Sequence, residues 1–436
     1  MTPLAHGVGS RADLPIPVWL ALYGAGLAVV ISFAALRVLW PQPRLQGAAA
    51  GRPVTGWLAG VLDSAAFRAV VRGVVALVAT VAVLGALFGT ADTENSLAVY
   101  LFYVELWVGL VVVSLLLGPV WRAVNPLRSL HAAAARLAGG DPDSGVIALP
   151  TAIGYWPAAA SLAAFAWLEL VPPWRVEPRV VGVFLVLYAM AHLVAAAVYG
   201  AQWFDRCDGF EVYSTLVGQL APFGRRDDRR LVVLNPLNGL DTIRPAPGLV
   251  AVVCVLIGST AYDGVTRARW WKNAVPADNV LLGTAGLAAA IAIVAGTFIV
   301  ATRLAARSSE LSPAEMPARF VHSVIPIAVG YALAHYFSLL LFEGQRALAL
   351  ASDPFGRGAD MFGTATWQTN YTWVSARVIS LAQVGFIVVG HIVGVVAAHD
   401  RAVRLFPVRH AVRGQLPLLV VMVAYTVAGV GLLLGA

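Results

Sequence analysis

The chain has 436 residues, of which 59% are hydrophobic and only 12% are charged, and its formal net charge is +7. Soluble domains are about a quarter charged, so this composition excludes an ordinary soluble protein. No basic soluble region is present on which nucleic-acid binding could rest. The apolar residues instead form runs long enough to cross the ~30 Å hydrocarbon core of a bilayer.

These runs predict an all-α polytopic membrane protein with about ten transmembrane helices in one bundle. Within lipid each spanning segment must satisfy its own backbone hydrogen bonds, which favours helices. We expect the whole chain, 1–436, to form a single transmembrane helical domain. The predicted spans are about 16–40, 70–90, 97–120, 149–171, 178–201, 247–263, 279–303, 320–343, 374–400 and 415–435.

Basic residues predict the orientation of the spans. Most of them, including Arg44, Arg68 and Arg401, fall in one alternating set of loops and span ends. Such loops are cytoplasmic by the positive-inside rule, which places both termini outside. The bias toward arginine and alanine indicates a GC-rich genome, so we expect a multi-pass protein of a bacterial inner (plasma) membrane, with the lipid bilayer as its main partner.

The longest predicted cytoplasmic connection, 202–246, contains two notable segments. Residues 209–223 have apolar side chains at helical spacing, which predicts a helix lying along the membrane surface. Just before and within it, Asp205, Asp208 and Glu211 offer three carboxylates in seven residues. Carboxylates suit magnesium, calcium or manganese, although a solvated or arginine-paired charged face explains them more simply.

Asn-Pro-Leu occurs twice, at 125–127 and 235–237. Asparagine before proline favours a turn, because the residue before proline is disfavoured in helical geometry. The residues flanking the two tripeptides differ, so they do not predict an internal repeat.

Three histidines lie inside predicted spans: His192, His335 and His391. An ionisable group in hydrocarbon usually faces a bundle interior, a cavity or a metal. Counted at ~1.5 Å per residue, His192 and His391 lie about 15 Å from the predicted inner edge and His335 about 24 Å. The histidines are candidate ligands of a zinc-like divalent metal, and isolated helix–helix hydrogen bonding is the simpler alternative.

Two glutamates accompany these histidines in the predicted membrane region. Glu105 lies within the third span, and Glu343 lies at the outer end of the eighth span. Each is a candidate catalytic residue, as metal ligand or general base. By contrast, His322, His399 and Asp400 lie at the predicted inner face, where we expect exposure to solvent.

Three stretches of the chain resemble a bacterial family of integral membrane proteins whose members are often named fenitrothion hydrolase. They are AHGVGSRADLPIPVWL, AQWFDRCDGFEVYSTLVGQLAPFGRRDDRRLVV with NPLNGLDTIRPAPG, and AHYFSLLLFEGQRALALASDPFGRGADMFGT. The resemblance covers most of the chain. It implies hydrolysis of an organophosphorus triester, with a divalent metal as cofactor, and it assigns no catalytic residue.

Three functions are compatible with the sequence. The resemblance favours a membrane-embedded, metal-dependent hydrolase of an apolar ester, in which metal-bound water is the nucleophile. A transporter of a small solute or metal ion fits the polar residues within the spans, although no inverted repeat is visible. A non-catalytic assembly or scaffold protein needs no cavity. The expected ligand in the first two cases is a small apolar substrate or solute.

Overall fold

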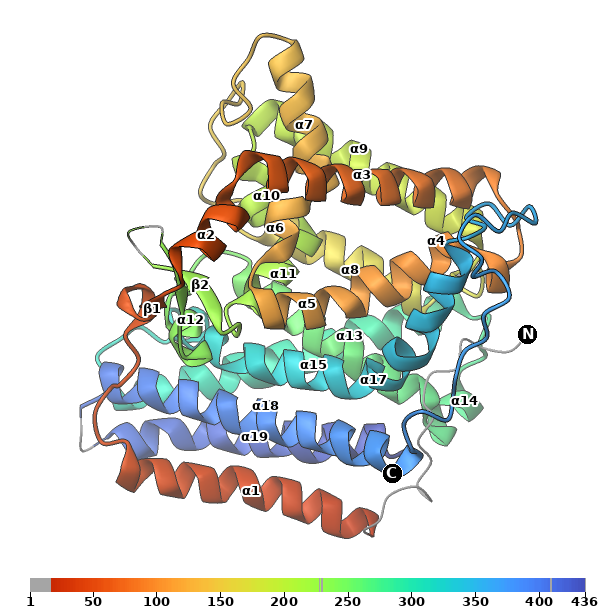
Figure 1. Cartoon of the computed structure of the whole chain (residues 1–436). Helices are drawn as coiled ribbons and strands as arrows, with labels where there is room; N and C mark the ends of the chain where they lie inside the picture. The colour runs from red at the N-terminus through yellow and green to blue at the C-terminus, as the bar shows by residue number, and fades with distance from the viewer. Residues whose placement is uncertain (1–16, 227, 229, 408–409, 436) are drawn as a thin grey trace. The chain divides into compact units, whose positions relative to one another are not determined.

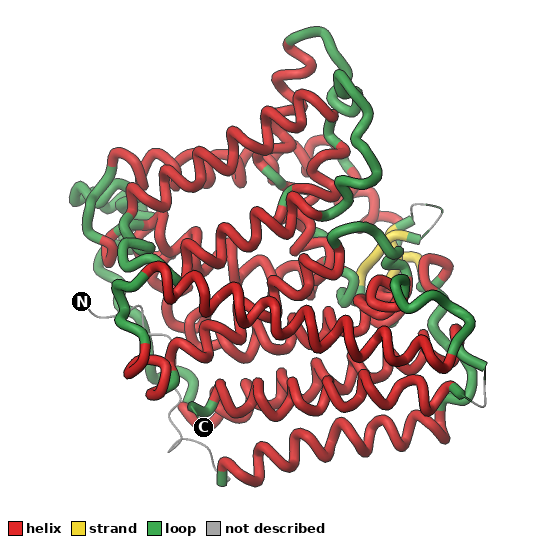
Figure 2. Tube along the Cα trace, turned by 180° about the vertical axis from the view of Figure 1, so that it is seen from behind, coloured by secondary structure: helices red, strands yellow, loops and turns green. Residues whose placement is uncertain are grey.

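The structure, a computed structural model, describes residues 17–226, 228, 230–407 and 410–435. The predicted positions of the two termini, and the part of the first resemblance segment before residue 17, therefore fall outside the described residues. Figures 1 and 2 show a mainly helical chain with three short strands, which confirms the all-α prediction. Among the described residues, nine helices are long and apolar enough to cross a membrane.

The contacts of the chain are concentrated in two compact units, where the sequence predicted one domain. Unit 1 comprises Gly51–Val233 and Leu339–Tyr371. Unit 2 comprises residues 17–50, 234–338 and 372–435 of the described chain. The helix α17 (Ile325–Leu350) contributes its first part to unit 2 and its last part to unit 1.

Unit 1 consists of short and long helices and one small antiparallel sheet of order β1-β3-β2, drawn in yellow in Figure 2. Its elements are α2 (Gly56–Asp63), α3 (Ala65–Phe88), η3 (Thr93–Asn95), α4 (Leu97–Tyr100), η4 (Leu101–Gly109), α5 (Leu110–Leu117), α6 (Val120–Val124), α7 (Pro126–Leu137), α8 (Trp156–Leu170), α9 (Pro178–Tyr199), α10 (Gln202–Cys207), α11 (Gly209–Gly218), β1 (Arg52–Pro53), β2 (Phe223–Arg225) and β3 (Leu231–Val233).

Unit 2 contains most of the remaining long helices, and its core lies where they cross. Its elements are α1 (Val18–Leu39), η2 (Gly47–Ala49), α12 (Pro236–Asp241), α13 (Leu249–Arg267), α14 (Arg269–Ala274), α15 (Val280–Ala305), η5 (Ala306–Ser308), α16 (Met316–Phe320), η6 (Val321–Val324), the first part of α17, α18 (Ala376–Leu405) and α19 (Ala411–Leu433).

Small residues allow a close approach of α17 and α18 in unit 2. A Cβ added to Gly330 of α17 would lie 3.1 Å from the Cα of Gly390 on α18, and the reverse distance is the same. The two backbones therefore meet at this point, as small residues allow in membrane helices.

Hydropathy predicted most spans well, but three local predictions were wrong or incomplete. The fourth predicted span corresponds to α8, which has only 15 residues and follows a series of turns. The helix α11 does not present a face to the membrane surface, because all of its residues except Thr215 are buried. His322, His399 and Asp400 are buried rather than exposed, with Asp400 accepting hydrogen bonds from Trp40 Nε1 and Arg404.

Candidate functional site

Unit 1 contains a cavity of about 360 Å³, which we call the unit 1 cavity. It lies among α3, the α4–η4–α5 segment, the α6–α7 junction, α9 and the start of α11. Val78 and Val113 line it and are 43% and 40% exposed, so the cavity reaches the surface between α3 and α5. Its wall is largely apolar, with the side chains of Glu105, Asn125, Tyr188 and Asp208 as its main polar groups. A predominantly apolar cavity with a few polar groups is typical of a small-molecule site.

Glu105 lies on η4, which is a π-helix within the third span. The amide of Leu110 donates to the carbonyl of Glu105, five residues earlier. This spacing defines a π-helix. π-Helical segments inside longer helices occur frequently at functional sites. No hydrogen bond or ion pair joins the Glu105 carboxylate to any residue that the structure describes, although the group lies in a membrane-spanning segment. A carboxylate placed there without a partner indicates a functional position.

Two glycines make room for the Glu105 carboxylate, because they have no side chain at positions next to it. A Cβ added to Gly109 would lie 3.1 Å from Oε2, and one added to Gly344 would lie 3.2 Å from Oε1. Gly109 ends the π-helix and Gly344 belongs to the part of α17 in unit 1. The predicted catalytic residue Glu343 precedes Gly344 and is buried, but it is not among the residues that line the unit 1 cavity.

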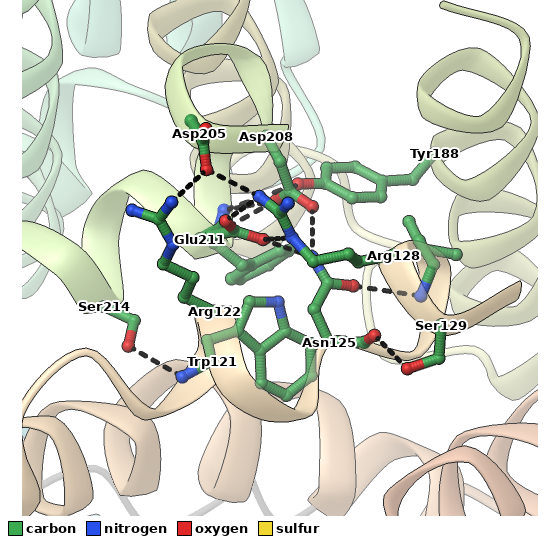
Figure 3. Close-up of polar contacts among 12 residues, drawn as sticks. Trp121, Arg122, Asn125, Arg128, Ser129, Tyr188, Asp205, Asp208, Glu211 and Ser214 are labelled. Atoms are coloured by element: carbon green, nitrogen blue, oxygen red, sulfur yellow. Dashed lines mark hydrogen bonds and ion pairs between the residues drawn. The ribbon is translucent and has the colours of Figure 1, made fainter. Parts of the chain in front are cut away.

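The other polar end of the cavity is built around Asp208, which is fully buried. Asp208 precedes α11, and its Oδ1 accepts hydrogen bonds from the amides of Phe210 (3.0 Å) and Glu211 (3.1 Å), as an N-cap residue does. The same oxygen accepts from the hydroxyl of Tyr188 at 2.6 Å. Its Oδ2 accepts from Asn125 Nδ2 at 3.0 Å (Figure 3). Four donors hold this carboxylate, so its geometry is fixed.

Asn125 shows how a local sequence signal positions this network. Its Oδ1 accepts from the amide of Leu127 at 2.9 Å and Pro126 occupies the first helical position, so the tripeptide starts α7. The side-chain oxygen of Asn125 thus caps the helix, and its side-chain nitrogen points to the carboxylates. This nitrogen donates to Asp208 and, at 2.9 Å, to Glu211. Asn235 caps α12 in the same way, at 3.0 Å to Leu237. The sequence predicted a turn at both tripeptides, and the structure places a helix start there.

Arg128 of α7 forms hydrogen bonds with two further carboxylates near Asp208. It donates to both oxygens of Glu211 and, at 2.7 Å, to Asp205, which also pairs with Arg122 at 3.0 Å (Figure 3). Burial raises the pKa of Glu211, and the hydrogen bonds from Arg128 oppose that shift. Burial lowers the pKa of Arg128, but its hydrogen bonds and charge interactions with Glu211 and Asp205 together outweigh this effect, so the net pKa is raised. Arginine pairing is therefore found for Asp205 and Glu211, whereas Asp208 is held by Asn125, Tyr188 and two backbone amides.

The three predicted metal ligands lie on three helices, one in unit 1 and two in unit 2. In unit 1, His192 Nδ1 accepts from Trp203 Nε1 at 2.9 Å. In unit 2, His391 Nδ1 lies 2.8 Å from the carbonyl of Ile387, within its own helix. Within the described part of the chain, no group of three or more His, Cys, Asp or Glu residues is arranged to hold a metal ion. Metal binding by these histidines remains a prediction.

His335 has partners that the sequence did not indicate. Its Nε2 lies 2.6 Å from Asp263 Oδ2 and 2.9 Å from Arg267 Nη2, both on α13 in unit 2. Arg267 also pairs with Asp263 at 3.1 Å. A neighbouring carboxylate fixes the orientation of an imidazole. In the sequence, Asp263 is the last residue of the sixth predicted span, 247–263.

Comparisons of the chain with models of protein families, with curated proteins and with solved structures return no match. The class of the protein follows from its fold alone: it is an all-α polytopic membrane protein. The family resemblance stays a prediction.

Proposed function

We propose that unit 1 binds a small, largely apolar molecule that enters from the bilayer, as the binding step of a solute transporter. The observation that carries this proposal is the unpartnered carboxylate of Glu105 on a π-helix, facing an apolar cavity that reaches the surface. An ionisable group of this kind marks substrate, ion or proton pathways in membrane proteins. Glu105 is the residue that meets the polar part of the solute.

The lining of the cavity favours binding over chemistry. The amide of Asn125 and the hydroxyl of Tyr188 already donate to carboxylates, so they are not available to a reacting oxyanion. Among the described side chains that line the cavity, the indole of Trp121 is the remaining N–H or O–H donor. Acyl and phosphoryl transfer depend strongly on donors aimed at the developing negative charge.

Photolabelling with a small apolar diazirine, followed by peptide mapping of the full-length protein in nanodiscs, tests this proposal. We expect labelling of the α3 and α5 peptides that line the cavity. Ala79→Phe places a large side chain in the cavity wall and should remove this labelling. Ala69→Phe, on an exposed position of the same helix, is the matched control and should preserve it. Labelling spread over all apolar helices and unchanged by Ala79→Phe would contradict the proposal.

Hydrolysis of an apolar phosphotriester is a second candidate, because a carboxylate in apolar surroundings is suited to act as a general base. Here Glu105 would take a proton from water, and the divalent metal implied by the resemblance would polarise the ester. The test is release of the aryl alcohol from an aryl phosphotriester by purified protein, with and without added zinc or manganese. Turnover that falls at least tenfold in Glu105→Gln, but not in the exposed Glu177→Gln, would support it. Absence of turnover under every metal condition would exclude it for this ester class.

A further inference from the structure

The unit 1 cavity combines negative charge with aromatic rings. Its lining includes Glu105 and Asp208 but no arginine or lysine. The nearby Arg128 is not part of the lining, because its guanidinium is bonded to Asp205 and Glu211. The charge available to an occupant of the cavity is therefore negative.

Four aromatic side chains contribute to the same lining: Phe102, Trp121, Tyr188 and Phe210. The rings of Tyr188 and Phe210 have centroids 5.5 Å apart, and those of Phe102 and Phe210 are 6.5 Å apart. Three of these rings thus lie next to one another in the lining, and Phe102 is on the same π-helix as Glu105. Aromatic faces attract cations through their quadrupoles, and cages of such rings recognise quaternary ammonium groups.

The two carboxylates differ in what they offer a ligand. Asp208 already accepts three hydrogen bonds at Oδ1 and one at Oδ2, so it contributes charge more than hydrogen-bonding capacity. Glu105 has no hydrogen-bonded partner among the described residues and faces the cavity directly. Beside a neutral occupant, Glu105 would take up a proton, because an uncompensated carboxylate in apolar surroundings is costly. A cationic occupant would instead compensate the ionised carboxylate.

We propose that the ligand of the unit 1 cavity is a small lipophilic organic cation of the quaternary ammonium type. This inference rests on the proposed function, in which unit 1 binds a small molecule from the bilayer, and it names the chemical class of that molecule. Glu105 supplies the counter-charge, the rings supply cation–π contacts, and the apolar wall receives the hydrocarbon part. A volume of about 360 Å³ is near the lower end of typical ligand sites.

A matched pair of ligands isolates the charge. Benzyltrimethylammonium and neopentylbenzene have nearly the same shape, and only the first carries a positive charge. Equilibrium binding of each is measured with the full-length protein in nanodiscs of uncharged lipid, with empty nanodiscs as the background. We expect the cation to bind about tenfold or more tightly than its isostere, the range that a desolvated cation–π contact with a counter-charge permits.

Substitutions then test whether the preference for the cation over its isostere arises in this cavity. Glu105→Gln keeps the shape of the side chain and should abolish the preference for the cation, whereas Glu177→Gln should leave it intact. Phe210→Leu should weaken cation binding several-fold and affect the isostere less.

Equal binding of both ligands, or a preference that survives Glu105→Gln, would overturn the cation inference and leave the proposed function standing. Binding of neither ligand above background, together with failure of the photolabelling test, would overturn both.

Discussion

The hydroxyl of Tyr188 donates to Oδ1 of Asp208 over 2.6 Å and thereby joins α9 to the start of α11. Both groups line the unit 1 cavity. Hydrogen bonds to charged acceptors contribute about 1.5–3 kcal/mol, more than those between neutral groups.

Tyr188→Phe should therefore lower the free energy of unfolding of the detergent-solubilised protein by about 1.5–3 kcal/mol. Thermal or denaturant unfolding measures this loss. Tyr199→Phe on the same helix is the control, since its hydroxyl has no hydrogen bond among the described residues, and it should change stability by less than about 0.5 kcal/mol. Equal effects of the two substitutions would show that the bond to Asp208 contributes nothing specific.

The two Asn-Pro-Leu tripeptides offer a matched comparison. Asn235→Ala removes a helix cap alone and should cost about 0.5–2 kcal/mol. Asn125→Ala removes a cap and also two donors to buried carboxylates, so it should cost about 1.5–3 kcal/mol more. The free energies of unfolding of both variants, measured under the same conditions, test whether the loss is larger for Asn125→Ala. The additional role of Asn125 would be disproved by equal losses.

Glu211 should make stability depend on pH. Burial raises its pKa, so the folded protein holds the proton more tightly than the unfolded chain does. Its contribution to stability is then fully present below the ordinary value of 4.5 and is lost as the pH rises through the higher folded-state pKa. We expect Glu211→Gln to flatten the dependence of the melting temperature on pH just above 4.5. An unchanged slope would show that another group governs this range.

Gly109 should be needed for the position of the Glu105 carboxylate. An added methyl group would lie 3.1 Å from Oε2, so the carboxylate must move. We expect Gly109→Ala to weaken binding of benzyltrimethylammonium several-fold. Gly73→Ala is the control, because nothing lies within 4 Å of a Cβ at that position of α3. Alanine there should leave binding unchanged and should be neutral or slightly stabilising. Unaltered binding in Gly109→Ala would argue against the assigned role of Glu105.

In unit 2, Asp263 should be important for stability. Its carboxylate lies within hydrogen-bonding distance of both His335 and Arg267. Asp263→Asn should cost about 1–3 kcal/mol, a value kept modest because Arg267 is 30% exposed and partly screened by solvent. Asp278→Asn, at an exposed site in the same unit, should have little effect. Melting curves of the two variants distinguish these expectations, and coincident curves would exclude the role given to Asp263.

Much of the fold could be predicted because hydropathy acts locally. A run such as 178–201 is long and apolar, and the structure has a helix at Pro178–Tyr199. Glu105 was also identified from its position alone, because a carboxylate inside a span is conspicuous. The burial of α11 was not predictable, since its helical periodicity fits a protein interior as well as a membrane surface.

The polar contacts of the site depend on tertiary structure. Tyr188 is 20 residues from Asp208, and Asn125 is 83 residues from it. No spacing rule connects these positions, so the sequence alone does not predict the bond between Tyr188 and Asp208. The π-helix was likewise hidden, because the composition of 101–109 suits ordinary helical winding equally well.

The π-helical winding of η4 also determines how α4 is rotated relative to α5 about the axis of the span. A π-helix accommodates one residue more than an α-helix over the same length, and each residue of an α-helix turns the chain by about 100°. Deleting a single residue between Leu101 and Gly109 would therefore restore regular winding while α4 and α5 keep their phase. The π-helical segment absorbs one residue that, in regular α winding, would turn one end of the span by about 100° against the other.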